Sequence, residues 1–254
     1  MGTIKGRTIV ITGAGSGIGK AIAKRFAADG ATVVGTDVNA DGLAELDGID
    51  NILTTRADVT QWDEVKASVD LAVEKTGRID VYINDAGIAM EETIAATDVV
   101  RFDLLHRIHV NGCLHGMKAA LGYMRDQGSG HILNVISRVA ETDTVATSAY
   151  ASAKAAMWSL TRIGAAENAD RGILVNALFP GISRTAMTES GGIGDPSTLG
   201  APDQEYDTFK MLAELDPDGP TGKVWFHGQI YPMFQDSNDL GAVTGGLAAG
   251  RGDS

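Results

Sequence analysis

The sequence has little cysteine and no long apolar run. Cys113 is the single cysteine among 254 residues, so no disulfide can form within the chain. No apolar stretch approaches the roughly 20 residues that a membrane-spanning helix needs. The amino terminus enters a predicted strand within about ten residues, without the charged and then apolar leader of a secreted protein. We therefore expect a cytoplasmic protein that has no membrane as a partner.

Basic residues are also scarce relative to acidic ones. The chain carries 21 lysines and arginines against 33 aspartates and glutamates, for a formal net charge of −12 at pH 7. Nucleic acid is not expected as a partner, because a surface of this sign repels a phosphate backbone. Glycine, with 32 residues, and apolar side chains, at 44%, are plentiful. This composition predicts one domain with a sizeable core over residues 1–236 and a poorly ordered tail over residues 237–254.

A glycine-rich segment follows the first apolar run. Residues 8–11 read TIVI, the pattern of a buried parallel strand, and residues 12–19 read TGAGSGIG. Residues 20–28 then have helical spacing, so strand, loop and helix occur in the order that a dinucleotide-binding turn requires. An ordinary glycine-rich turn is the alternative. On the first interpretation the amides at the helix start face a pyrophosphate, and the cofactor-binding residues are Gly13, Gly15, Ser16, Gly17, Ile18 and Gly19.

Asp37 ends the second predicted strand, at residues 32–36. A carboxylate in this position can accept hydrogen bonds from both ribose hydroxyls of an adenosine, and it would repel a 2′-phosphate. Val38 follows it, and residues 37–41 contain no lysine or arginine. These observations favour NAD over NADP. A solvated acid that caps a turn is the alternative.

Short apolar strands alternate with helical patterns along the rest of the chain. Further strands are predicted at residues 52–57, 81–84, 131–136 and 174–178, and helices at residues 61–76, 99–125 and 149–169. This alternation predicts an α/β fold with a doubly wound parallel sheet and helices on both faces. Ligands of such sheets bind at the carboxyl ends of the strands. The predicted strand ends are marked by Asp37, Asp58, Asn84, Ser137 and Pro180.

Two of these strand ends extend the predicted cofactor site. Asp58 and Val59 follow the third strand, where the carboxylate could bind the adenine amino group and the valine could cover the ring. Asn84, Ala86 and Gly87 follow the fourth strand, and small residues there let the backbone pass close to a cofactor.

Tyr150 and Lys154 are four residues apart in a predicted helix, and Ser137 precedes them. Positions i and i+4 share one helix face, so the ammonium and the phenol can meet above one bound ligand. A phenol with a pKa near 10 is a poor base at neutral pH, and a fixed cation beside it favours the phenolate. Ser137 can add a hydroxyl donor towards a substrate oxygen. Together with the glycine-rich loop, this predicts redox chemistry on a carbonyl or an alcohol.

Asn111 and Gly112 interrupt the long helix predicted at residues 99–125, because both residues have low helix propensity. A kink that frees a backbone carbonyl for a water is one interpretation, and a buried polar contact is the other. His106 and His109 share a face of the same helix, but no carboxylate or cysteine pattern completes a metal site there. No metal is therefore predicted.

These motifs resemble the short-chain dehydrogenase/reductase family in its form of about 250 residues. The resemblance covers roughly residues 5–190 and implies a Rossmann-type fold that binds NAD(P). It implies that Tyr150 is the general acid/base, that Lys154 holds the nicotinamide ribose, and that Ser137 polarises the carbonyl. Asn111 would position a water in a proton relay. The nicotinamide carboxamide would meet the segment formed by Pro180, Gly181, Ile182 and Thr185.

Three departures from the family pattern qualify these expectations. Asp85 stands where the family more often has a second asparagine, and Arg138 follows the serine where a small residue is usual. The segment after Pro202 also differs from the commoner ending, although residues 223–232 still read as a strand and turn.

The substrate is expected to contact two segments, at residues 138–148 and at residues 182–215. The second reads as a mobile loop that closes over a small molecule, with Phe209, Met211 and Leu212 among its apolar residues. Glu141 and Asp143 could attract a substrate amine, or they are ordinary surface acids. The resulting expectation is a medium-sized aromatic or alicyclic alcohol or ketone, with an amino alcohol as the case in which the two acids bind an ammonium.

An NAD-dependent alcohol dehydrogenase or ketone reductase is thus the leading interpretation. The alternatives are a non-catalytic dinucleotide-binding sensor or assembly subunit, a reductase of 3-oxoacyl thioesters or sugars, and an epimerase or dehydratase. Two long helices carry more apolar surface than a sheet face can cover, so we expect a homodimer or a homotetramer. Residues expected to contribute to this surplus are Leu104, Leu105, Ile108, Leu121, Met157, Trp158 and Leu160.

Overall fold

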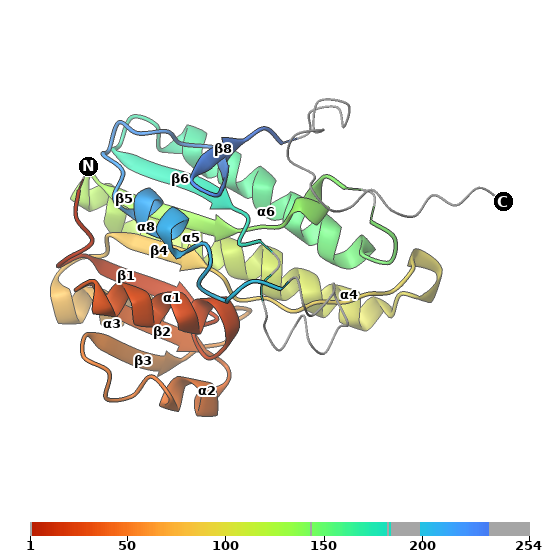
Figure 1. The fold of residues 1–254 in the computed structure, drawn as a ribbon, viewed down its shortest axis with the longest axis horizontal. Coiled ribbons are helices and arrows are strands. Elements are labelled where there is room, and N and C mark those ends of the chain that lie inside the picture. Colours follow the sequence, from red (N-terminus) through yellow and green to blue (C-terminus); the bar gives the residue numbers. More distant parts are fainter. Residues whose placement is uncertain (1, 143, 182, 184–198, 234–254) are drawn as a thin grey trace.

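An eight-stranded sheet forms the centre of the molecule (Figure 1). The computed structural model describes residues 2–142, 144–181, 183 and 199–233. The strand order is β3-β2-β1-β4-β5-β6-β7-β8, and all neighbouring strands are parallel except the pair β7–β8. The strands are β1 (Thr8–Thr12), β2 (Thr32–Asp37), β3 (Ile52–Arg56), β4 (Val81–Asn84), β5 (Gly130–Val135), β6 (Ile173–Leu178), β7 (Val224–Phe226) and β8 (Gln229–Tyr231).

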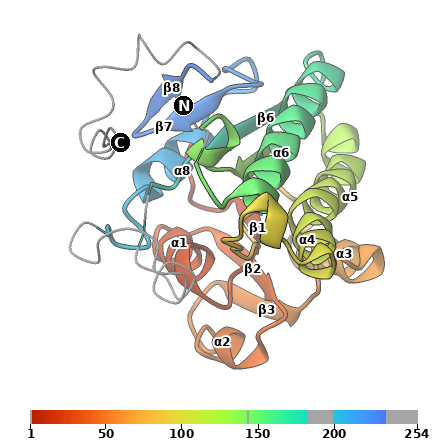
Figure 2. The same ribbon diagram turned by 90° about the vertical axis from the view of Figure 1, so that its right-hand side faces the viewer.

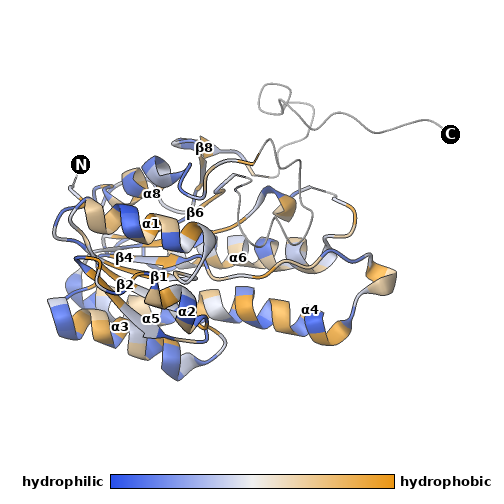
Figure 3. Ribbon diagram, turned by 60° about the horizontal axis from the view of Figure 1, so that its bottom comes forward, coloured by the Kyte–Doolittle hydropathy of each residue, from blue (hydrophilic) through white to orange (hydrophobic). Residues whose placement is uncertain are grey.

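Helices cover both faces of the sheet (Figure 2). Seen along its edge, α1 and α8 lie on one side and α3, α4 and α5 on the other (Figure 3). The helices are α1 (Gly17–Ala28), α2 (Ala40–Ala44), α3 (Trp62–Thr76), α4 (Val99–His106), α5 (Gly112–Gln127), α6 (Ser148–Glu167) and α8 (Tyr206–Ala213). The predicted doubly wound α/β fold is confirmed.

Each face of the sheet has its own hydrophobic core, because successive strand residues point to opposite faces. In β1, Ile9 and Ile11 pack with α1 and α8, whereas Val10 packs with α3, α5 and α6. Both faces of the central strands are therefore apolar, and β1 is buried along its whole length. This is the reason that the parallel strands read as continuous apolar runs.

The long helix predicted at residues 99–125 is interrupted, in agreement with the kink that was one of the two interpretations. A π-helical turn, η2 (Arg107–Asn111), separates α4 from α5. Such a turn inserts an extra residue and rotates the following helix, and it is frequent at functional sites. Asp98 fixes the start of α4 by accepting hydrogen bonds from the amides of Val100 and Arg101. Gly128 ends α5 in the left-handed conformation.

The predicted substrate segment at residues 182–215 differs from the expectation at its carboxyl end. Residues 206–213 form α8, and Phe209 and Leu212 are fully buried in the core that α1 shares. They therefore do not line a substrate pocket, because their side chains pack under the sheet. Met211 packs against the same core. Residues 182 and 184–198 lie outside the described residues, as do Asp143 and the predicted tail at 237–254.

Candidate active site

The glycine-rich loop joins β1 to α1 at the carboxyl edge of the sheet. Gly13 has φ 76°, and a Cβ atom there would lie 3.0 Å from the backbone of Ala86. Thr12 connects the same two segments, since its Oγ1 accepts hydrogen bonds from the amides of Asp85 (3.1 Å) and Ala86 (3.2 Å). A Cβ at Gly19 would lie 2.4 Å from the carbonyl oxygen of Gly13, so only glycine fits this close approach.

The start of α1 is suited to an anion. Ser16 is the N-cap residue and makes no capping hydrogen bond with its side chain, and no acidic residue lies in the first turn. Amides and the positive end of the helix dipole are therefore directed to the loop, as a pyrophosphate requires. The residues of the loop thus fit a dinucleotide.

Asp37 is held beside this loop. One carboxylate oxygen accepts a hydrogen bond from the amide of Gly15 at 2.9 Å, and the other accepts from the amide of Asn39 at 2.8 Å. Val38 is 53% exposed. Arg56 stands opposite Asp37 in the register of β2 and β3, a proximity that the sequence does not show. The Arg56 guanidinium binds Glu64 at 3.4 Å, so it already has an acidic partner.

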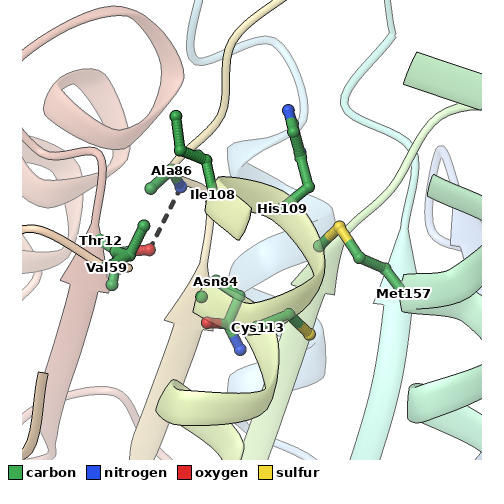
Figure 4. Close-up of a pocket in the computed structure, with 9 residues that line it drawn as sticks. Thr12, Val59, Asn84, Ala86, Ile108, His109, Cys113 and Met157 are labelled. Carbon is green, nitrogen blue, oxygen red and sulfur yellow. Dashed lines mark hydrogen bonds between the residues drawn. The ribbon is translucent and has the colours of Figure 1, made fainter. Parts of the chain in front are cut away.

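A narrow pocket begins where the ends of β1 and β4 meet the π-helical turn (Figure 4). Val59 and Asn84 line it, and Asn84 is fixed by a 2.8 Å hydrogen bond from its Nδ2 to Asn134 Oδ1. Asp58 lies next to Val59 and accepts a hydrogen bond from the amide of Thr60 at 2.8 Å. The full lining is Thr12, Val59, Asn84, Ala86, Ile108, His109, Gly112, Cys113 and Met157.

Ser137, Tyr150 and Lys154 come together, as the sequence predicted. Ser137 follows β5, and its side chain hydrogen-bonds to Tyr150 in α6. The Lys154 ammonium lies 5.4 Å from the centre of the Tyr150 ring, and its Nζ donates to the carbonyl oxygen of Val135 at 2.7 Å. Lys154 is 3% exposed, so its charge acts where water provides little screening.

The expected lowering of the Tyr150 pKa is not observed in the chain by itself. Burial raises the Tyr150 pKa, the carboxylate of Asp85 adds to the increase, and the hydrogen bond from Ser137 opposes it. Burial lowers the pKa of Lys154 to about 8, against the attraction of Asp85. Because the Lys154 ammonium is directed to the Val135 carbonyl, it does not lower the Tyr150 pKa enough to offset the increase caused by burial of the phenol.

The structure does not bring the Asn111 side chain into this group, and its part in a proton relay stays a prediction. Asn111 is exposed at the end of the π-helical turn, whereas His109 is 1% exposed and lies against Tyr150. Residues two apart in a helix point to opposite sides. The π-helical turn therefore places the His109 ring, and not the Asn111 side chain, against Tyr150.

The segment after β6 is described in part. Pro180 is half-buried, and its carbonyl oxygen accepts a hydrogen bond from Gln204 Nε2 at 3.0 Å. Gly181 has φ 68°, the left-handed conformation that permits the turn. Ile182 and Thr185 lie outside the described residues.

Comparison with known proteins agrees with this geometry. The profile of the family described as short chain dehydrogenase matches residues 7–193. The chain belongs to the short-chain dehydrogenase/reductase family. Levodione reductase of Leifsonia aquatica is 38% identical over 247 residues, which cover 93% of this chain and 85% of that protein. Its crystal structure superposes with a TM-score of 0.80, at 31% identity, covering 88% of this chain and 96% of that one.

A second solved structure shows a family member with its cofactor. The 3-ketoacyl-(acyl-carrier-protein) reductase from Brucella melitensis, complexed with NADH, has a TM-score of 0.80 and 29% identity. It covers 87% of this chain and 96% of that chain. The protein is thus an oxidoreductase of a family that binds a nicotinamide dinucleotide and acts on small molecules.

The residues that depart from the family pattern make defined contacts in the structure. Asp85 is half-buried, accepts a hydrogen bond from the amide of Gly19, and has its pKa raised to about 7, chiefly by burial. The Arg138 guanidinium lies 5.8 Å from the centre of the Tyr231 ring. Glu141 accepts a hydrogen bond from the Tyr231 hydroxyl at 2.5 Å. The carboxyl-terminal hairpin therefore reaches the expected substrate segment.

Within the described residues, no group of three or more histidine, cysteine, aspartate or glutamate side chains is arranged to hold a metal ion. In the same part of the chain, no helix combines the length and the apolar content needed to cross a membrane.

Proposed function

We propose that the protein is an NAD-dependent oxidoreductase that interconverts a secondary alcohol and its ketone. The contact between Ser137 and Tyr150, with Lys154 buried beside them, carries this proposal. Two hydroxyl groups at the carboxyl edge of the sheet can bind one substrate oxygen. When bound, the nicotinamide ring supplies or accepts the hydride. A dinucleotide sensor without chemistry is the alternative, and it would need none of these three side chains.

Tyr150 is the proposed general acid/base. In ketone reduction it donates its proton to the carbonyl oxygen, and in alcohol oxidation it accepts the hydroxyl proton. Its raised pKa keeps the phenol protonated, which suits donation. Ser137 donates a second hydrogen bond to the oxygen as negative charge develops there. Lys154 supplies a positive charge that lowers the cost of forming the phenolate, and it would hold the nicotinamide ribose.

The remaining cofactor contacts are proposed as the sequence predicted them. The loop from Gly13 to Gly19 binds the pyrophosphate. Asp58 and Val59 contact the adenine. The segment after β4, with Asn84, Ala86 and Gly87, passes close to the cofactor. Asp37 supports NAD rather than NADP, because a 2′-phosphate beside its carboxylate would meet a like charge. Ile182 and Thr185 would contact the carboxamide.

A medium-sized aromatic or alicyclic ketone or alcohol remains the proposed substrate class. Similarity to levodione reductase over most of the chain supports a ketone. Similarity to the Brucella melitensis reductase supports the alternative, a 3-oxoacyl thioester. An amino alcohol as substrate has less support, because the Glu141 carboxylate already accepts a hydrogen bond from the Tyr231 hydroxyl.

The test is a panel of secondary alcohols and ketones assayed by NADH absorbance. Tyr150→Phe should lower kcat by at least about 100-fold, the usual effect of removing a general acid/base. Tyr123→Phe is the matched control, because the Tyr123 hydroxyl binds Asp70 between α3 and α5, away from the site. Normal turnover by a folded Tyr150→Phe protein would contradict the proposal.

We also propose that the protein assembles through α4, α5 and α6. Of the residues expected to form surplus apolar surface, Leu105, Met157 and Trp158 are buried within the chain. Leu104 is 43% exposed, and Leu114 and Ile163 are exposed on the same three helices. Pairing with a second copy would cover them, and a homodimer with twofold symmetry is the simplest arrangement; a tetramer would require a further interface.

A further inference from the structure

His109 lies in the π-helical turn and is almost completely buried, yet half of its hydrogen-bonding capacity is unused. Its Nε2 lies 2.8 Å from the carbonyl oxygen of Ile88 and 3.1 Å from the amide of the same residue. Burial and the charge of Lys154 both lower the His109 pKa well below its usual value, so the ring is neutral. The Ile88 amide would donate to an unprotonated Nε2, whereas the Ile88 carbonyl accepts from a protonated one, so the two contacts belong to different tautomers. From the shorter contact we infer that the single proton lies on Nε2, which donates to the Ile88 carbonyl.

The other ring nitrogen, Nδ1, therefore carries a lone pair. It is inaccessible to solvent and has no hydrogen-bond partner among the described residues. A buried acceptor without a donor costs about 1–3 kcal/mol. Such a group calls for an explanation, and one explanation is that a donor reaches it during function.

Three neighbours fix the orientation of the ring. The backbone of Ile88 holds Nε2, and the Tyr150 ring lies edge-on, with centroids 5.4 Å apart and planes at 82°. On a further side, a Cβ atom added at Gly87 would lie 2.4 Å from His109 Cε1. The imidazole thus joins the segment after β4 to the tyrosine of the proposed reaction.

Lys154 has hydrogen-bond donors to spare, whereas His109 has an unused acceptor. The Lys154 ammonium has three N–H donors, and one of them donates to the carbonyl oxygen of Val135. It is close enough to His109 for its charge to affect the imidazole, and both groups contact the Tyr150 ring. A buried donor and a buried acceptor therefore lie near the same phenol ring.

We propose that His109 is a positioning residue for proton transfer, which orients Tyr150 and offers Nδ1 as the hydrogen-bond acceptor of the Lys154 ammonium, directly or through one water. When Tyr150 gives its proton to the substrate oxygen, the Lys154 ammonium can return a proton to the phenolate, and the neutral amine then regains a proton from solvent. A neutral acceptor at Nδ1 favours the charged form of Lys154 and directs it to Tyr150. This inference rests on the proposed function and adds a residue to it.

Two substitutions separate hydrogen bonding from packing. His109→Gln retains one donor for Ile88 and one acceptor, but it loses the ring. His109→Phe retains the ring against Tyr150 and loses both nitrogens. We expect the Gln variant to retain kcat within about threefold and the Phe variant to lose roughly 10- to 100-fold, the effect of a mispositioned reacting group. If packing alone mattered, the order would be reversed, and that result would overturn the proposal.

The pH dependence provides a readout that a packing role would not change. Without an acceptor, the charged form of Lys154 loses support, so the limb of the kcat profile that reports Lys154 should move to lower pH in the Phe variant. The Gln variant should keep the profile of the unaltered protein. Asp85 is the carboxylate that also acts on Lys154, and it is unchanged in both. Identical profiles in all three proteins would overturn the proposal.

His106→Gln is the matched control, because His106 lies one turn earlier and bonds to Phe102 and Ser152 instead. Its kcat and pH profile should be unaltered. Nitrogen NMR of labelled histidine tests the tautomer independently of activity, and it should show a neutral ring protonated at Nε2 at pH 6. A cationic ring or a proton at Nδ1 would overturn the inference. Absence of turnover in the unaltered protein would instead contradict the proposed function.

Discussion

Replacing Asp85 by asparagine should stabilise the folded protein, and more so as the pH rises. Asp85 lies just after β4, near Lys154 and Asp37, and accepts a hydrogen bond from Gly19 at the start of α1. Burial is the main reason that its pKa is raised from 3.8 to about 7, with Asp37 adding to the increase and Lys154 opposing it. Asparagine has the same shape and no charge to bury.

The sign follows from proton binding. Between pH 4 and pH 7 the folded chain holds a proton on Asp85 that the unfolded chain has released, so stability falls as the pH rises through this window. A pKa difference of about three corresponds to about 4 kcal/mol as an upper limit. Because Asp85 keeps partial access to water, we expect about 1–2 kcal/mol. Since about 1 kcal/mol shifts Tm by roughly 2–4 °C at this chain length, the gain should be about 2–8 °C.

The assay is thermal unfolding at pH 5 and pH 8 without added dinucleotide. The Tm difference between Asp85→Asn and the unaltered protein should be larger at pH 8. Asp126→Asn, at an exposed position on α5, is the control and should give a small difference of equal size at both pH values. A difference for Asp85→Asn that stays constant or shrinks at pH 8 would refute the reasoning.

Three further changes test other parts of the structure. Asp37→Ala should reduce the preference for NAD over NADP in kcat/KM, and equal efficiency of the unaltered protein with both cofactors would contradict the role of Asp37. Phe209→Ala should lower the free energy of unfolding by about 3–5 kcal/mol in denaturant titrations, because the side chain is fully buried under the sheet; a loss below about 1 kcal/mol would argue against that burial. Leu104→Glu combined with Leu114→Glu should weaken the proposed dimer in light scattering, and a mass near 26.5 kDa for the unaltered protein would reject assembly altogether.

Local patterns were sufficient to predict the sheet and the phosphate loop. Strands such as β1 and β6 are buried on both faces, so they appear as continuous apolar runs whatever surrounds them. Gly13 and Gly19 serve contacts within their own turn and with the neighbouring strand end, which the spacing already indicates. Tyr150 and Lys154 share a helix face because of helical periodicity alone.

The tertiary structure decided what depends on contacts between distant segments. The sequence located the kink after residue 106, but the π-helical turn and its packing against α6 decided that His109 faces Tyr150 while Asn111 faces solvent. The apolar residues of α8 could have lined a pocket or a core, and packing with α1 made them core. The raised pKa values of Asp85 and Tyr150 arise from burial beneath segments far away in the chain. Periodicity specifies which side of an element is apolar, but burial and charge depend on what the fold places opposite it.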